Sequence, residues 1–461
     1  MDDNKFEIKK RDMMCLWKAV FNDADEYINL LFNSYYNDEM FIARYDHDRL
    51  ISQLYCIPYR FSAICDMINA GSDNSCVSLC QTMIDCGYLC GLATLPEYRN
   101  SGIMSSLINM SNIYLHNNGF AISFLIPASK SLRLYYGKFG YTDISYYTSR
   151  IYIERGENSK NYIIDYNHNK SLYSVETGVY KYSVIDVNEY LIKDFGDVCM
   201  SCESRDMNII YAYLRYAVGR IHGIVIRHSY FDFITVLKEN IISGGYVLFI
   251  KDGNNKPSGL LFCSNITEGE ATVQLLVAES EESANILLHI LKSLLPDDTN
   301  VIVHEYDGAV RKSSKHDLTE RPETGHCPMP SGETMPMTNG IAAWKRKSFA
   351  MARILNVAEI LKFAACLYPD SKFSILVNHD DFTENEGFYE VRNGKVSFMP
   401  LSGMTEAEMV RIERCCSIGR DCFRLTVPEL AAILWRDISD PIESNLAVIP
   451  RMPIDLFLML E

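Results

Sequence analysis

One stretch of the chain, residues 86–129, alternates strand, glycine-containing turn, helix and strand. The runs CGYLCGLATL (86–95) and FAISFLIPAS (120–129) are rich in residues that favour strands. Between them, apolar residues recur every three to four positions over 103–114, which predicts a helix that ends by Gly119. Such an alternation is typical of an α/β fold, in which a helix N-terminus that follows a strand can bind a ligand.

The rest of the chain extends this pattern over two regions. In the first, an amphipathic helix over 12–36 opens the chain, and strand patterns follow at 40–46 and 49–61. The second region, 156–307, repeats the same order of elements. Its helices are predicted at 208–219, 232–242 and 283–295, and its strands at 246–253, 257–265, 271–280 and 300–306. The turn before 283–295 contains no glycine, so we expect this second copy to be structural and to lack a phosphate site.

A third region begins at Trp344, after an aperiodic stretch at 309–340 whose proline and glycine content predicts a surface loop. Its pattern predicts a compact α+β module. The elements are a helix at 351–364, strands at 373–381 and 387–400 with a hairpin turn at Asn393-Gly394, and a strand followed by a helix at 424–435. We therefore expect three domains, at 1–155, 156–343 and 344–461.

Length and charge narrow the classes of function. The chain has 461 residues, and 44 Lys and Arg against 59 Asp and Glu leave a net charge of −15. Such a charge repels nucleic acid and anionic lipid, whereas it favours cationic small molecules. The start, MDDNKFEIKK, has no apolar leader, and the chain has no uncharged apolar run of membrane-spanning length. We expect a cytoplasmic protein that binds neither nucleic acid nor membrane.

The 15 cysteines are scattered along a chain that is too long to need disulfides, so we expect reduced thiols in the core. Cys199 and Cys202 form a CxxC pair, but no second pair follows, and a structural zinc site needs four ligands. We therefore expect no metal. Cys86 and Cys90 lie four residues apart on a predicted strand, which places both on one face as packing residues.

The turn at 95–104, LPEYRNSGIM, is the first candidate for chemistry. Gly102 lets the backbone approach a ligand, and the amides that begin the next helix suit a pyrophosphate. Arg99 adds a full positive charge at the edge of the turn. A strand, turn and helix with one glycine and one arginine is also common in structural roles, so this turn by itself leaves both interpretations open.

The second candidate is SLRLYYGKFGY at 131–141, which alone is equally compatible with a surface turn of packed aromatic residues. Together, RNSG (99–102) and YYGKFGY (135–141) resemble the GNAT superfamily of acetyl-CoA-dependent N-acyltransferases, and more narrowly the enhanced intracellular survival (Eis) family. In addition, MARILNV (351–357) and RLTVPELAAIL (424–434) resemble the sterol-carrier-protein-like C-terminal domain of those enzymes. The resemblance implies an α/β (α+β) fold with two tandem GNAT domains, mixed sheets flanked by helices, and a sterol-carrier-like domain.

The resemblance also implies roles for two residues. Tyr136, the first Tyr of YGKFGY, matches the general acid of the family, and a phenol with a reference pKa of about 10 can protonate a departing thiolate. The C-terminal carboxylate of Glu461 matches the general base, and the apolar tail before it fits burial. Alternatives stay open: Tyr136 as a packed aromatic residue, a tail that only packs on its own domain, and a Glu461 side chain that binds a cationic substrate.

Acetyl-CoA is the co-substrate that the resemblance implies, with no metal. Its expected contacts are the preceding strand, the turn and the start of the helix: Leu92, Ala93, Thr94, Arg99, Asn100, Ser101, Gly102, Ile103 and Met104. Met104 departs from the small residue that the wider superfamily has there. Pro127 and Lys130 stand where relatives can carry His and Glu, which weakens an expectation of aminoglycoside substrates. His116 is expected to be an exposed helix residue rather than a catalyst.

We therefore expect an acetyl-CoA-dependent N-acetyltransferase in which a primary amine attacks directly, without a covalent enzyme intermediate. The net acidity favours a cationic acceptor, either a small amine or a lysine side chain. The alternative is a non-catalytic acyl-CoA or lipid-binding protein on the same scaffold, which would need neither Tyr136 nor a native C-terminus. The resemblance further implies a homo-oligomer, and hexamers are frequent in the family.

Overall fold

The computed structural model describes residues 2–68, 77–152, 162–167, 172–177, 180–188, 205–221, 224–306, 341–343, 346–418, 421–437, 446–452 and 454–456. Their contacts divide them into two compact units. Unit 1 draws on 1–146, 223–227 and 348–456, and unit 2 on 147–222 and 228–347. Both units contain β-sheet flanked by helices, which confirms the α/β fold class expected from the sequence.

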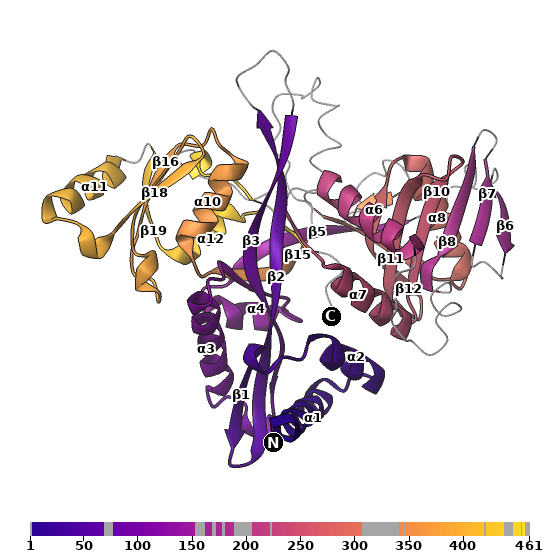
Figure 1. Cartoon of the computed structure of the whole chain (residues 1–461), viewed down its shortest axis with the longest axis horizontal. Helices are drawn as coiled ribbons and strands as arrows, with labels where there is room; N and C mark the ends of the chain where they lie inside the picture. The colour runs from indigo at the N-terminus through magenta and orange to yellow at the C-terminus, as the bar shows by residue number, and fades with distance from the viewer. Residues whose placement is uncertain are drawn as a thin grey trace. The chain divides into compact units, whose positions relative to one another are not determined.

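Unit 1 is built on a sheet of strand order β20-β9-β2-β3-β4-β15-β5, and β1 pairs with β2. Strands β2 and β3 form a long antiparallel hairpin (Figure 1). β3 and β4 are parallel and are connected through helix α3, as the pattern at 86–129 predicts. The strands are β1 (Phe41–Asp46), β2 (Arg49–Ile68), β3 (Val77–Thr94), β4 (Ile122–Leu125), β5 (Thr142–Tyr152), β9 (Ile224–Ile226), β15 (Lys347–Ile354) and β20 (Ile454–Asp455).

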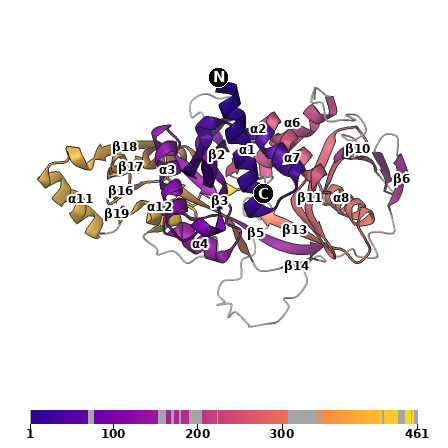
Figure 2. The ribbon, with the colours of Figure 1, turned by 90° about the horizontal axis from the view of Figure 1, so that it is seen from below.

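Helices pack on both faces of the β2–β3 hairpin (Figures 1 and 2). Trp17 of α1 lies against Gly91 of β3, whereas Leu115 of α3 lies against Gly87 on the opposite face. The helices of this part are α1 (Asp2–Phe21), α2 (Asp25–Tyr35), α3 (Ile103–Asn117) and α4 (Lys130–Gly137). The single opening helix predicted over 12–36 is wrong, because Asn22 takes a left-handed φ of 58° and a second helix begins at Asp25.

The C-terminal part of unit 1 enters the same sheet. β15 pairs antiparallel with β4, from Met351↔Leu125 to Ile354↔Ile122. The helix predicted over 351–364 is therefore wrong at its start: MARI is a strand, and α10 (Val357–Leu367) begins after Asn356, whose side chain accepts from the amide of Glu359. Residues 350–354 are buried throughout, and such a run does not distinguish a buried strand from a helix by periodicity.

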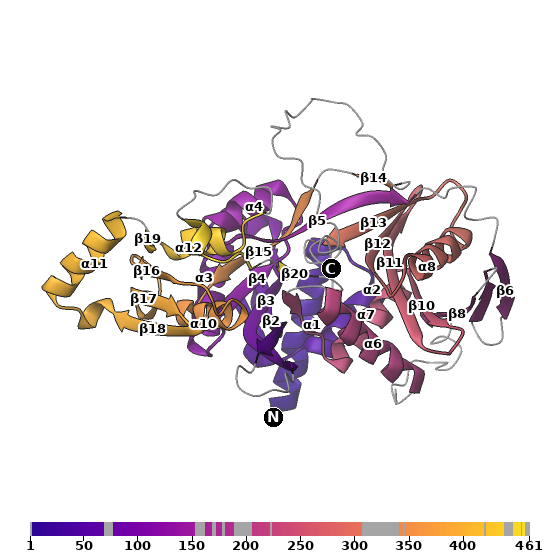
Figure 3. The ribbon, with the colours of Figure 1, turned by 90° about the horizontal axis from the view of Figure 1, so that it is seen from above.

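A second sheet of unit 1 has the strand order β18-β17-β16-β19. The predicted hairpin turn at Asn393-Gly394 is confirmed, with φ values of 52° and 71°. Helix α10 packs against β17 and β18, whereas α11 packs against β19 and β16 (Figure 3). The elements are β16 (Phe373–Val377), β17 (Gly387–Arg392), β18 (Lys395–Pro400), β19 (Cys422–Leu425), α11 (Glu406–Ile418) and α12 (Val427–Leu434).

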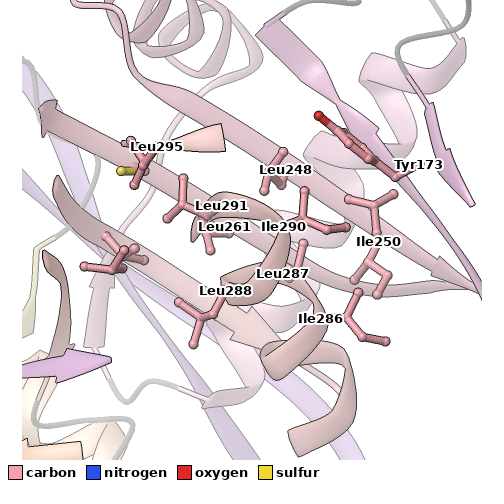
Figure 4. Close-up of a cluster of buried hydrophobic side chains, with 14 of the residues drawn as sticks. Tyr173, Leu248, Ile250, Leu261, Ile286, Leu287, Leu288, Ile290, Leu291 and Leu295 are labelled. Carbon is pink, nitrogen blue, oxygen red and sulfur yellow. The ribbon is translucent and has the colours of Figure 1, made fainter. Parts of the chain in front are cut away.

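Unit 2 contains the strand order β13-β12-β11-β10-β8-β7-β6, and the second half of β5 pairs with β13 and β14. Helix α8 packs its apolar side on β10, β11 and β12, where Leu287 and Leu291 lie over Leu261 (Figure 4). The elements are β6 (Ile163–Asn167), β7 (Leu172–Glu176), β8 (Lys181–Asp186), β10 (Tyr246–Asp252), β11 (Pro257–Thr267), β12 (Glu270–Ala278), β13 (Asn300–Tyr306), β14 (Ile341–Ala343), α6 (Arg205–Ile221), α7 (Tyr230–Ile242) and α8 (Glu281–Leu294).

The elements predicted between 208 and 306 are confirmed. The start of α8 is capped by its own sequence, because Ser280 Oγ accepts from the amide of Ser283 at 3.1 Å. One donor that an anion would need is therefore already used. The loop predicted at 309–340 lies outside the described residues.

Candidate functional site

The turn between β3 and α3 exposes its backbone at Gly102. Gly102 is the N-cap of α3 and has a left-handed conformation, with φ 81° and ψ 0°. A Cβ added at Gly102 would have no atom within 4 Å, so the space in front of the helix is open. Asn100 is also left-handed, with φ 64°. Two left-handed residues on either side of Ser101 let this turn direct several backbone amides outward.

The first amides of α3 have no partner within the described part of the chain. The earliest backbone hydrogen bond of the helix runs from the amide of Ser106 to the carbonyl of Gly102, at 3.1 Å. Among the described residues, no hydrogen bond uses the amides of 100–105. Free amides at the positive end of a helix dipole form an anion site. The predicted residues Asn100, Ser101, Gly102, Ile103 and Met104 thus lie together at this helix end.

Three side chains hold the turn in place. Arg99 Nε donates to the carbonyl of Thr94 at 3.1 Å, and Ser101 Oγ donates to the carbonyl of Tyr98 at 2.5 Å. Tyr98 Oη donates to Asp46 at 2.6 Å, which ties the turn to the end of β1. Arg99 remains exposed, so its guanidinium is available at the edge of the anion site.

The edge of β3 that faces β4 is paired over only part of its length. The parallel pairing with β4 covers Cys86–Tyr88, whereas β3 continues for six more residues to Thr94. Within the described part of the chain, no strand pairs with this edge beyond Tyr88. The backbone groups of the stretch Leu92, Ala93 and Thr94 that point to this edge are therefore open to an extended ligand.

Sequence reasoning missed a β-bulge in this strand. Tyr55 of β2 pairs with Cys90, and Gln53 pairs with Ala93, so two β3 residues oppose Leu54. Gly91 lies at the bulge with φ 60°, and a Cβ there would lie 2.2 Å from the ring of Trp17. A glycine inside a strand pattern was the available signal for it.

Tyr136 projects from α4 into a hydrophobic cluster with residues of β2, β3 and α3, including Leu54, Leu89 and Leu107. The side chain is 7% exposed, and its hydroxyl has no hydrogen-bond partner among the described residues. Burial, reinforced by the neighbouring Tyr135, raises the pKa of Tyr136 to about 12. The phenol is therefore protonated at neutral pH, in the state that a proton donor needs.

Two further tyrosines connect the motif at 131–141 to α3. Tyr135 Oη lies 3.0 Å from Oγ of Ser105, in the first turn of α3. Tyr141 Oη donates to Asn112 at 2.9 Å and lies 2.7 Å from Oγ of Ser123. Both motifs that the sequence singled out thus belong to one packed assembly. The pairing partners Ser105 and Asn112 carried no signal in the sequence.

The C-terminal part of the chain holds the YGKFGY turn from its other side. Arg353 of β15 donates to the carbonyl of Phe139 at 3.0 Å and to Asp381 at 2.6 Å. Its guanidinium also lies 3.9 Å from Asp380 and 5.3 Å from the ring of Phe382. Arg353 is therefore a buried charge whose partners come from two other segments of unit 1, Phe139 and 380–382.

Replacing Arg353 with Met is expected to destabilise the protein by about 3 kcal/mol or more, because Asp380 would remain buried without its counter-charge. The measurement is the free energy of unfolding in a denaturant titration. Arg392→Met is the matched control, since Arg392 pairs with Glu390 at 3.0 Å on the surface, where an ion pair contributes about 0–1 kcal/mol. Equal losses for the two variants would contradict this assignment.

The prediction that His116 is an exposed helix residue is wrong. Its ring stacks on Phe382 at a centroid distance of 4.1 Å, and Nδ1 lies 2.9 Å from the carbonyl of Leu355. His116 thus joins α3 to the C-terminal part of unit 1. Helical periodicity places a side chain on a face but does not reveal a partner that is more than two hundred residues away.

Of the other predicted residues, some lie outside the part of the chain that the structure describes and some lie within it. Glu461 and the Cys199/Cys202 pair lie outside the described residues. Cys86 is fully buried and Cys90 is half-buried on the same face of β3. No group of three or more His, Cys, Asp or Glu side chains suited to a metal ion occurs among the residues that the structure describes.

A small pocket lies on the face of the sheet that carries α1 and α2. It is lined by Trp17, Leu31, Phe32, Tyr36, Phe41, Gln53, Tyr55 and Gly91, so the bulge of β3 forms one wall. Gln53 Oε1 has no hydrogen-bond partner in the described part of the chain. The pocket combines aromatic rings with this buried oxygen atom.

Comparison with known proteins identifies the first region. Residues 76–144 match the family model described as an acetyltransferase (GNAT) domain, which spans β3, the turn, α3, β4 and α4. No curated protein matches the chain. The chain therefore contains an acetyltransferase domain of the GNAT type, as the two motifs indicated.

Solved structures share the fold over nearly the whole chain. A GCN5-related N-acetyltransferase from Kribbella flavida superposes with a TM-score of 0.58 at 13% identity, covering 97% of this chain and 96% of its own. A probable N-acyltransferase from Enterococcus faecalis gives 0.57 at 12% identity, covering 93% and 88%. Eis1 from Mycobacterium abscessus gives 0.52 at 12% identity, covering 93% and 87%. At such identities, the likeness is one of fold.

None of the helices that the structure describes combines the length and the apolar character needed to cross a lipid bilayer.

Proposed function

We propose that the acetyltransferase domain of this chain transfers the acetyl group of acetyl-CoA to a primary amine by direct attack. The observation that carries the proposal is the continuous run of open backbone groups, from the free edge of β3 to the uncapped start of α3. Acetyl-CoA fits both the strand edge and the helix start, because it joins an extended chain with amide groups to a pyrophosphate. The edge would pair with the pantetheine, and the amides of 100–104 would bind the phosphates.

In the proposed reaction, the amine nitrogen attacks the thioester carbonyl, and a backbone amide of β3 stabilises the oxygen that becomes negative. The C–S bond then breaks, and Tyr136 gives its proton to the departing sulfur. The terminal carboxylate of Glu461 takes the proton that the attacking nitrogen loses, directly or through water. The products are an amide and a thiol, so the proton balance closes once Tyr136 is reprotonated.

The net charge of −15 supports a cationic acceptor. The acceptor is thus proposed to be a small cationic amine or a lysine side chain.

We further propose the domain division 1–155, 156–343 and 344–461, with the third domain delivering the C-terminus to the active site. Two observations support a close connection of this domain to the catalytic one. β15 joins the sheet of unit 1, and Arg353 holds the YGKFGY turn. The resemblance to Eis enzymes supports a sterol-carrier-like fold for it and a homo-oligomeric state.

The function is tested with the full chain, without a C-terminal tag. Calorimetric titration with acetyl-CoA is expected to show binding in the micromolar range, and a panel of primary amines is expected to release free thiol in proportion to acetylated amine. Binding without thiol release for any amine would favour the acyl-CoA-binding alternative. Absence of binding would overturn both interpretations.

The terminal carboxylate gives a separate prediction. Deleting Glu461, or extending the chain beyond it, is expected to lower the rate of thiol release about 100-fold, the usual contribution of a general base, with little change in acetyl-CoA affinity. Glu461→Ala is the matched control, because it keeps a terminal carboxylate while it removes the side chain. A loss in Glu461→Ala as large as in the deletion would assign the effect to the side chain instead.

A further inference from the structure

A cluster of cysteines lies where α11 ends and β19 begins, in the second sheet of unit 1 (Figure 3). Cys415 and Cys416 occupy the last turn of α11, and Cys422 is the first residue of β19. The Sγ atoms of Cys416 and Cys422 are 3.0 Å apart, and both residues are free thiols. The two sulfurs are thus already within reach of each other.

The two thiols differ in access. Cys422 is 5% exposed and belongs to the core of the second sheet, whereas Cys416 is half-buried and Cys415 is exposed. A reagent from solution can therefore reach Cys416 more readily than Cys422. This is the arrangement of an attacking thiol and a resolving thiol.

Hydrogen bonding and the charge of Arg424 also favour Cys416 as the attacking thiol and Cys422 as the resolving thiol. The hydrogen bond with Cys422, assisted by the guanidinium of Arg424, lowers the pKa of Cys416. The same hydrogen bond, together with burial, raises the pKa of Cys422. Arg424 is held near α11 by Glu413, at 3.8 Å. Of the two thiols, Cys416 therefore loses its proton more readily than Cys422.

We propose that Cys416 and Cys422 form a reversible redox site that reacts with low-molecular-weight disulfides, in a part of the protein separate from the acetyltransferase motifs. Cys416 thiolate attacks one sulfur of the small disulfide, whose S–S bond breaks and releases one thiol. Cys422 then attacks the mixed disulfide on Cys416 and releases the second thiol. Two protein thiols are oxidised and one small disulfide is reduced, with the two protein protons passing to the two released thiols.

The cross-link would act on α11. No side chain of this helix is buried, and Val410 and Ile418 are 60% and 67% exposed. The helix is therefore attached by few packing contacts, and a covalent bond from its last turn to β19 would restrict its opening. The expected readout of oxidation is slower hydrogen exchange of the amides in 406–418.

The test uses the full chain and glutathione disulfide as the probe. Oxidation is expected to remove two hydrogen atoms from the intact mass and to join two tryptic peptides, CCSIGR (415–420) and DCFR (421–424). Because the first peptide contains two cysteines, variants assign the bond. Cys416→Ser is expected to lose the cross-link, whereas Cys415→Ser, the matched neighbour, is expected to keep it. Cys422→Ala is expected to stop at a glutathione adduct on Cys416.

Several results would overturn the proposal. One is a cross-link that persists in Cys416→Ser and disappears in Cys415→Ser. Another is a native protein that accumulates only glutathione adducts and no intramolecular bond. Circular dichroism of the reduced variants checks that each is folded, and the exposed position of Cys415 makes its substitution a safe reference. None of these readouts depends on acetyltransferase activity.

Discussion

Replacing Gly102 with Val is expected to weaken the binding of acetyl-CoA at least about 100-fold. The left-handed φ of 81° and the empty space in front of Gly102 leave the amides of α3 accessible, and a branched side chain would fill that space. Loss of two hydrogen bonds from amides to charged oxygens costs about 3 kcal/mol or more, or roughly two powers of ten in affinity. Calorimetric titration of the two proteins with acetyl-CoA measures the change.

The same helix provides the control. Gly119, at the other end of α3, has a φ of 82°, and a Cβ there would also have no atom within 4 Å. Gly119→Val therefore imposes the same backbone strain, of about 1–2 kcal/mol, at a helix end that carries the negative pole. We expect its affinity for acetyl-CoA to stay within a factor of about three. Equal losses in both variants would mean that helix stability, and not the anion site, controls binding.

Tyr136→Phe is expected to lower kcat about 100-fold or more while leaving the affinity for acetyl-CoA unchanged. The change removes only the hydroxyl, which has no partner among the described residues, so the free energy of unfolding should shift by less than about 1 kcal/mol. Steady-state thiol release and a denaturant titration give the two quantities. A variant with native kcat would remove Tyr136 from the mechanism.

The pKa of Tyr136 adds a pH dependence to this prediction. Because burial raises that pKa to about 12, the phenol keeps its proton from neutral pH to about pH 11. The rate of the native enzyme should therefore rise with pH, as the acceptor ammonium and the general base lose protons, without an alkaline decline below about pH 10. A decline centred near pH 9 would show that the proton donor is another group.

Tyr141→Phe separates a structural tyrosine from a catalytic one. Its hydroxyl bonds to Asn112 and lies 2.7 Å from Ser123 in a fully buried site, so its removal leaves buried polar groups unpaired. We expect a loss of about 1–3 kcal/mol in stability, with kcat of the remaining folded protein little changed. Tyr136→Phe should thus lower kcat with little effect on stability, whereas Tyr141→Phe should lower stability with little effect on kcat.

Most elements of the fold could be predicted from the sequence, because their signals are local. The alternation at 86–129 and the hairpin turn at Asn393-Gly394 depend on periodicity and on left-handed backbone preferences over a few residues. The prediction failed at 12–36 and at 351–354. In the first case, a break at Asn22 was hidden in a continuous amphipathic pattern. In the second, a fully buried strand had no alternation to reveal it.

Part of the candidate site could likewise be predicted from the sequence, and part of it could not. Gly102 and its neighbours could be proposed as an anion site because a helix N-terminus is formed by consecutive residues. The bulge at Gly91 and the free edge of β3 depend on the registers with β2 and β4, which pair residues from distant parts of the chain. No pattern in a single sequence specifies such registers.

By itself, the sequence determined the α/β class, the order of the elements and the two motifs at 95–104 and 131–141, since each depends on residues close together in the chain. Only the tertiary structure decided that β15 enters the first sheet, that Arg353 holds the carbonyl of Phe139, and that Tyr136 is buried with a raised pKa. Burial, strand register and ion pairing depend on segments hundreds of residues apart. Their energies come from the packed state, which local propensity does not encode.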